Sequence, residues 1–149
     1  MKTGAFFTAV GLGMAAGATV ALMLPRQCAI RQAMQKAADE LVGEHDFSSF
    51  ASVHAQTNTY VRTIYGLDVI REGDMIRIRV RGNGFLYNMV RIIAGTLIQV
   101  GAGIKQPEDI KSILAGKDRE LAGPTAPAHG LTMIGLEYLE NTDVCQSRE

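Results

Sequence analysis

Apolar residues are most concentrated between Gly84 and Gly101, where they recur every three or four positions. This spacing is typical of an α-helix with one broad buried face. The predicted face comprises Leu86, Met89, Val90, Ile93, Leu97 and Val100. The segment contains a single charged residue, Arg91. Because a guanidinium buried without a partner costs several kcal/mol, we expect an anion from the protein or from a ligand to meet Arg91.

Two segments before this helix, 60–70 and 75–81, have the composition and alternation of β-strands, and a turn sequence at 71–74 separates them. The second segment alternates strictly between two kinds of side chain. Its apolar positions are Ile76, Ile78 and Val80, and its polar positions are Arg77, Arg79 and Arg81. Since side chains alternate across a strand, one face is predicted to be buried and the other wholly cationic.

The remaining elements complete an α+β pattern. An amphipathic helix is predicted over 28–42, and a shorter one from near Gln106 to Gly116, where Pro107 suits the first turn. Residues 44–50 are expected to form a compact turn, and 123–130 are too rich in turn residues for a helix or a central strand. A last strand is predicted over 131–139. We therefore expect an antiparallel sheet with helices on one face.

The first 27 residues differ from the rest of the chain. No charged residue lies between Thr3 and Pro25, and 4–24 are mostly apolar or small. As a helix, that stretch spans roughly 30 Å, about the thickness of the bilayer core. A membrane helix, a secretory signal and an unrelated, loosely packed leader all stay open. With an anchor, the positive-inside tendency would leave the C-terminal part in the cytoplasm. We divide the chain into an apolar leader (1–27), a folded domain (28–140) and a polar tail (141–149).

Charge and cysteine content add two limits. The 15 basic and 15 acidic residues cancel, so any basic surface must be local. The three alternating arginines, with Arg62 on the neighbouring strand, could follow a phosphate backbone; a solvated sheet face is the alternative. Cys28 and Cys145 have no metal-ligand spacing, which argues against a structural zinc site and a disulfide framework.

Histidines offer little chemistry. His45 and Asp46 precede Ser48 and Ser49, a set of residue types found in hydrolases. Adjacent residues on a turn rarely face one another, however, and the chain has no nucleophile elbow. We therefore interpret 44–50 as a structural turn and expect no catalysis there.

Four motifs occur in an order and spacing that resemble one known family. They are Glu44–Phe50, Val61–Ile64, Gly82–Arg91, and Asp118-Arg119 followed by Gly123–Leu131. Over about residues 29–140 the chain resembles the C-terminal half of the bacterial tRNA pseudouridine synthase A family. The resemblance implies half of the pseudouridine synthase fold, preceded here by the apolar helix predicted at 4–24.

The resemblance also implies an activity. The family isomerises uridine to pseudouridine in the anticodon stem-loop of tRNA, without a cofactor or a required metal, and the target nucleotide must leave the stack. An aspartate acts as the nucleophile. By motif position, Arg91 is its partner and Leu131 packs in the pocket. Recognition of RNA by phosphate and shape fits Arg77, Arg79, Arg81 and Arg62 as RNA-binding residues.

One motif of the family is absent from the printed sequence. The nucleophile of the family lies in an R-T-D-x-G-V-H-A motif in the N-terminal half, whereas Arg62-Thr63 is followed here by Ile64. We therefore expect the chain alone to be inactive and Arg91 to be solvent-exposed, bound to a phosphate or paired with a local acid. Half of a split synthase and a membrane-tethered RNA- or protein-binding module are the alternatives. Expected partners are tRNA, the missing half or a second copy, and the domain is expected in the cytoplasm.

Overall fold

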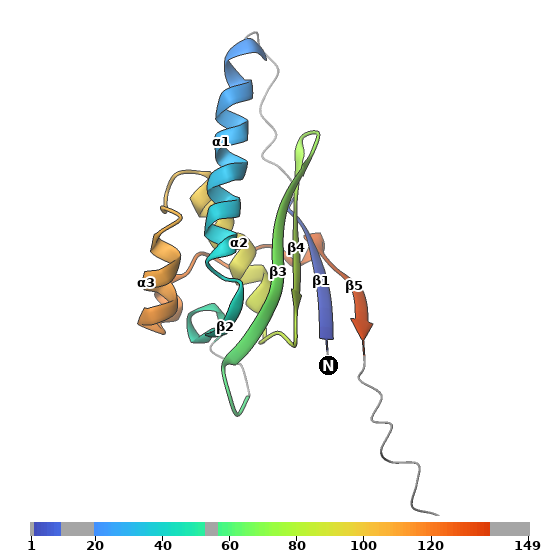
Figure 1. Ribbon diagram of the computed structural model, residues 1–149, viewed down its shortest axis with the longest axis vertical. Coiled ribbons are helices and arrows are strands. Elements are labelled where there is room, and N and C mark those ends of the chain that lie inside the picture. The colour runs from blue at the N-terminus through green and yellow to red at the C-terminus, as the bar shows by residue number, and fades with distance from the viewer. Residues whose placement is uncertain (1, 10–19, 53–56, 138–149) are drawn as a thin grey trace, which may run out of the picture.

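The computed structural model describes residues 2–9, 20–52 and 57–137 of the chain. Five antiparallel strands form one sheet in the order β2-β3-β4-β1-β5, and the α-helices lie together on one side of it (Figure 1). The strands are β1 (Lys2–Ala9), β2 (Gly43–Asp46), β3 (Val61–Glu72), β4 (Met75–Gly82) and β5 (Leu131–Glu137). The α-helices are α1 (Val20–Asp39), α2 (Met89–Gly101) and α3 (Asp109–Gly116). The predicted α+β class is confirmed.

The β3–β4 hairpin is the centre of the sheet and confirms the two strands predicted from alternation. Leu67 pairs with Val80 and Val69 pairs with Ile78, and all four side chains are buried on the side of the helices. The pairing shifts by one residue between Ile64 and Gly66, a β-bulge in β3. Because side chains alternate along a strand, this shift changes which residues of β3 share a face.

Helix α1 packs across β3 and closes the core from one side. Its buried positions include Ala37 and Ala38, which have no exposed surface, and Met34, which is 2% exposed. The Gln35 side chain also ties the helix to the strand, since it donates to the Leu67 carbonyl at 3.0 Å and accepts from the Val69 amide at 2.8 Å. The helix predicted over 28–42 is thus present, but it begins at Val20 and crosses the expected leader boundary.

The apolar helix expected over 4–24 needs correction. Residues 2–9 form β1, which pairs with β4 on one side and β5 on the other. Strands β4 and β5 do not pair with each other. Strand β1 lies between them and forms backbone hydrogen bonds with the facing edge of each. Residues 20–24 belong to α1, and 10–19 lie outside the described residues. Across the part of the chain that the structure describes, no helix is long and apolar enough to cross a membrane.

The segment predicted as a compact turn is partly a strand. Gly43–Asp46 forms β2, which pairs with Val61–Ile64 of β3. Gly43 has a φ of +111°, a left-handed conformation that glycine adopts without the steric cost of a Cβ. The turn itself follows β2 as a 3₁₀ helix, Ser48–Phe50, with Phe47 and Phe50 fully buried.

Helix α2 confirms the apolar stripe but begins later than predicted. Every position of the predicted face is buried, including Leu86, which precedes the helix. The helix starts at Met89 because Asn88 has a φ of 59°, which interrupts the right-handed helical conformation. Asparagine tolerates the left-handed region better than other residues with a Cβ. Helix α3 likewise starts at Asp109, three residues after the predicted start at Gln106.

Candidate active site

A cavity of about 210 Å³ lies between the start of α2 and the start of β5. Both elements contribute side chains to its wall, as does the segment that joins β4 to α2. The lining residues are Phe85, Leu86, Asn88, Met89, Val90, Arg91, Leu131 and Met133. Arg91 is the one residue of this set that carries a charge, and the walls around it are mostly apolar.

The Arg91 guanidinium is half-buried and bound by two neutral acceptors. Its Nε donates to the backbone carbonyl of Ala126 at 2.7 Å, and its Nη1 donates to Oδ1 of Asn88 at 2.9 Å. Within residues 2–9, 20–52 and 57–137, no carboxylate forms an ion pair with Arg91. Of the three alternatives for Arg91, pairing with a local acid is not seen among these residues. The positive charge stays uncompensated by any described residue.

Close packing of the loop 123–128 against α2 fixes the Ala126 carbonyl. A Cβ on Gly95 would lie 1.7 Å from the Pro124 carbonyl oxygen, and one on Gly123 would lie 2.6 Å from the Thr96 Cα. Only glycine permits such approaches of two backbones. The Ala126 amide also donates to the Arg91 carbonyl at 3.0 Å. The loop and the helix therefore hold each other at the point where Arg91 binds.

Two side chains anchor this loop further. The Thr96 hydroxyl is buried, accepts from the Gly123 amide at 2.8 Å and donates to the Ile92 carbonyl at 2.8 Å. Arg119 donates to the Gly123 carbonyl at 2.9 Å and to the Thr125 hydroxyl at 3.2 Å. Arg119, Gly123 and Thr125 thus position the loop, and they do not line the cavity themselves.

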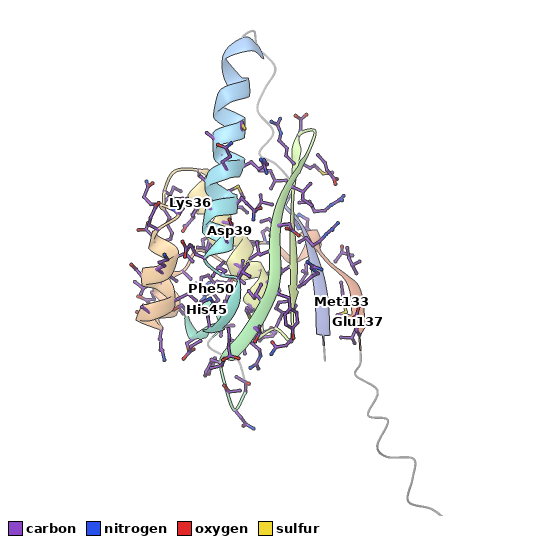
Figure 2. The ribbon with its side chains drawn as sticks, in the orientation of Figure 1. Lys36, Asp39, His45, Phe50, Met133 and Glu137 are labelled. Carbon is purple, nitrogen blue, oxygen red and sulfur yellow. The ribbon has the colours of Figure 1, made fainter. Side chains whose placement is uncertain are left out.

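Leu131 lines the same cavity as Arg91, and its role in an active-site pocket stays a prediction. It is 38% exposed at the first position of β5. Met133, two residues further along the same strand, also lines the cavity and is 67% exposed. Figure 2 shows Met133 and Glu137 along this outermost strand. Sequence reasoning missed Met133, Asn88 and the Ala126 carbonyl; the position of Asn88 three residues before Arg91 was the available signal.

The predicted cationic face of β4 is present on the side of the sheet away from the helices. Ile78 and Val80 are fully buried, and the arginines alternate with them. Arg81 is exposed, whereas Arg77 forms an ion pair with Glu72 at 2.6 Å. Arg79 lies opposite Asp68 in the register of the β3–β4 pair. The alternation predicted along β4 is thus present, and a role of these arginines in RNA binding stays a prediction.

Arg62 does not join this group. It lies on the same side of β3 as the buried Ile64, because the β-bulge at Ile64 and Gly66 changes the alternation before the segment that faces β4. Its guanidinium donates to the Thr59 and Val61 carbonyls at 3.0 and 2.6 Å. The geometry therefore assigns Arg62 to the ordering of its own loop.

His45 and Asp46 end strand β2, and Ser48 and Ser49 lie in the 3₁₀ turn that follows it. The Asp46 carboxylate accepts from the Ser48 amide at 3.0 Å and pairs with Lys117 at 2.8 Å. The Lys117 ammonium, together with the Ser48 hydroxyl, lowers the pKa of Asp46 below its ordinary value. The His45 Nε2 lies 3.1 Å from the Val42 carbonyl oxygen and makes no contact with a serine hydroxyl. Among the described residues no group of histidine, cysteine, aspartate and glutamate could hold a metal ion.

Comparisons with known proteins agree on one family. A family model described as tRNA pseudouridine synthase matches residues 37–138. The tRNA pseudouridine synthase A of Brevibacillus brevis is 58% identical over 106 residues, which cover 71% of this chain and 43% of the relative. The enzyme of the same name from Halalkalibacterium halodurans is 55% identical over 124 residues, 78% of this chain and 47% of the relative.

The chain thus spans about half the length of the relatives that it matches. The matched residues 37–138 include Arg91, Asn88, the loop 123–128 and Leu131, so the whole cavity belongs to the shared region. The matched span covers more than half of the 149 residues, and the chain belongs to the tRNA pseudouridine synthase family.

Proposed function

We propose that this chain supplies the arginine-bearing half of a tRNA pseudouridine synthase site and is inactive alone. The nucleophilic aspartate would come from polypeptide outside these 149 residues. The observation that carries the proposal is the state of Arg91: it is held in a mostly apolar cavity by two neutral acceptors, with no described carboxylate paired to it. A half-buried guanidinium without a paired carboxylate favours the binding of an anion.

The chemistry gives Arg91 a defined task. A nearby positive charge lowers the pKa of an aspartate and keeps it ionised, which is the form that attacks as a nucleophile. During isomerisation the bond from ribose C1′ to uracil N1 breaks and a bond from C1′ to C5 forms. The base then gains a proton at N1 and loses the hydrogen from C5 to solvent. No electrons are exchanged with another molecule, so the reaction needs no redox cofactor.

The flipped uridine needs apolar walls as well as the charged pair. Leu131 and Phe85 supply such walls beside Arg91. The cationic face of β4 would hold the tRNA backbone by phosphate contacts, and exposed Arg81 is the side chain best placed to reach it. Action on tRNA would place the protein in the cytoplasm.

The proposal is tested by tritium release from tRNA that carries uridine tritiated at C5. We expect no release by the purified chain and release after mixing with the aspartate-bearing segment of a full-length relative, such as the Bacillus subtilis enzyme. Arg91→Ala should abolish the restored release, because the aspartate loses its charge partner. Arg71→Ala, at an exposed position of the β3 end, is the matched control and should not change it. Turnover by the chain alone would contradict the proposal.

A further inference from the structure

We infer that Asn88 is a positioning residue that holds Arg91 so that one carboxylate can bind end-on to its Nη1–Nη2 edge. The inference rests on the proposed function and assigns a task to a residue that the sequence resemblance does not. Its basis is the hydrogen bond from Arg91 Nη1 to Asn88 Oδ1 at 2.9 Å, at the wall of the cavity.

The N–H groups of Arg91 that have no described acceptor determine the side from which a carboxylate can approach. Arginine has five N–H groups in a planar fork. The Nε group of Arg91 is taken by the Ala126 carbonyl, and one Nη1 group is taken by Asn88. Among the described residues the Nη2 groups and the second Nη1 group have no recorded acceptor. A carboxylate that binds at the end of the fork with two parallel hydrogen bonds uses one Nη1 and one Nη2 group, while the other Nη2 group points to the side of Nε. With Asn88 on the outer Nη1 group, the end of the fork is open to a carboxylate.

The backbone around Asn88 fixes the position of its amide oxygen. Asn88 has a φ of 59°, and its carbonyl accepts from the Ile92 amide at 3.0 Å. The neighbouring Tyr87 carbonyl accepts from the Ser52 amide at 3.2 Å. Both contacts hold the chain where it enters α2, so the Asn88 side chain has little freedom relative to Arg91.

The neutrality of the amide is the property that matters. Aspartate has nearly the same shape as asparagine and also tolerates the left-handed region. An aspartate at this position would form an ion pair with Arg91, compensate its charge and repel an incoming carboxylate. A purely structural contact would be kept or strengthened by this change, whereas an open anion site would be closed by it.

The first experiment uses the chain alone, with acetate as the carboxylate probe. The Nε–Hε signal of Arg91, assigned by its loss in Arg91→Lys, is followed by NMR during an acetate titration. We expect a saturable shift in the wild type and binding at least about tenfold weaker in Asn88→Asp. Thermal unfolding should show that Asn88→Asp is as stable as the wild type or more so. An acetate response in Asn88→Asp equal to that of the wild type, or no response in the wild type, would overturn the inference.

The second experiment separates the inference from the proposed function. In the mixture with the aspartate-bearing segment, Asn88→Asp should lower tritium release about a hundredfold, the order of effect found when an active site loses one electrostatic contact to a charged group. Asn88→Gly, which keeps the left-handed backbone but removes the amide, should lower it less. Release by Asn88→Asp equal to that of the wild type would overturn the inference and leave the proposed function standing. An absence of release with the wild type would contradict the proposed function, and the acetate titration would still decide the role of Asn88.

Discussion

Substitution of Gly95 by alanine tests whether the loop 123–128 controls the Arg91 site. Gly95 lies within α2, where alanine is favoured over glycine by about 1 kcal/mol. Helix propensity alone therefore predicts a more stable protein. The packing predicts the opposite, because the new Cβ would lie 1.7 Å from the Pro124 carbonyl oxygen and 2.9 Å from the Pro124 carbonyl carbon.

The size of the effect follows from these distances. Ordinary contact between a carbon and an oxygen is about 3.5 Å, so the Pro124 carbonyl has to retreat by well over an ångström. Overpacking of this kind costs about 1–3 kcal/mol. The retreat also strains the two hydrogen bonds between Ala126 and Arg91, each worth about 1 kcal/mol. After the gain in helix propensity is subtracted, we expect a net loss of about 2 kcal/mol in the free energy of unfolding.

Urea unfolding followed by circular dichroism measures this loss. Gly135→Ala is the matched control, because a Cβ there has nothing within 4 Å, and its stability should change by less than about 0.5 kcal/mol. The acetate titration of Arg91 should also weaken in Gly95→Ala, since Ala126 moves with the loop. A Gly95→Ala protein that is more stable than the wild type, with an unchanged acetate response, would refute the reasoning.

Three further changes have defined outcomes. Thr96→Val leaves a buried loop amide without an acceptor and should cost about 1–3 kcal/mol in urea unfolding; a neutral result would show that the loop does not need this bond. Asp46→Asn should cost at most about 1 kcal/mol at pH 7, because it removes the ion pair with the exposed Lys117 ammonium. The folded-state pKa of Asp46 is lowered, so its stabilisation is present above the unfolded value of about 3.9 and is lost as the pH falls through the folded value. Wild type and variant should therefore converge in stability once the pH is below the folded-state pKa of Asp46, and a difference that stays constant with pH would contradict this cause. Arg81→Glu should weaken tRNA binding and reduce its salt dependence by about one counterion, whereas Arg71→Glu should do neither. Equal effects of the two substitutions would argue that tRNA does not bind to the cationic face of β4.

Local patterns predicted most of the secondary structure. The alternation in β4 and the three- and four-residue spacing in α2 depend only on which side of one element is buried, and both were correct. Residues 2–9 could not be identified as a strand in this way. Their pairing depends on a space between β4 and β5, which are distant in sequence, and an apolar stretch fits a helix equally well.

The candidate site likewise combines residues that the sequence indicated with contacts that it did not. The resemblance named Arg91 and Leu131, and both line one cavity, while their roles in catalysis stay predictions. Arg62 was grouped with the wrong face because a one-residue bulge in β3 reverses the alternation, and the sequence carries no clear sign of it. The neutral partners of Arg91 come from the left-handed conformation at Asn88 and from a loop that packs on α2 from 35 residues away. Such contacts arise from tertiary packing.

The central claim is that the chain carries the arginine of a catalytic pair whose aspartate lies on other polypeptide. The most direct test is a titration of the aspartate-bearing segment of a relative into a fixed amount of this chain, with tritium release from C5-labelled tRNA as the readout. We expect no release without the segment, a rise as the segment is added, and saturation at one segment per chain. Release by the chain without the segment, or release by the segment that is unchanged when this chain is omitted, would contradict it.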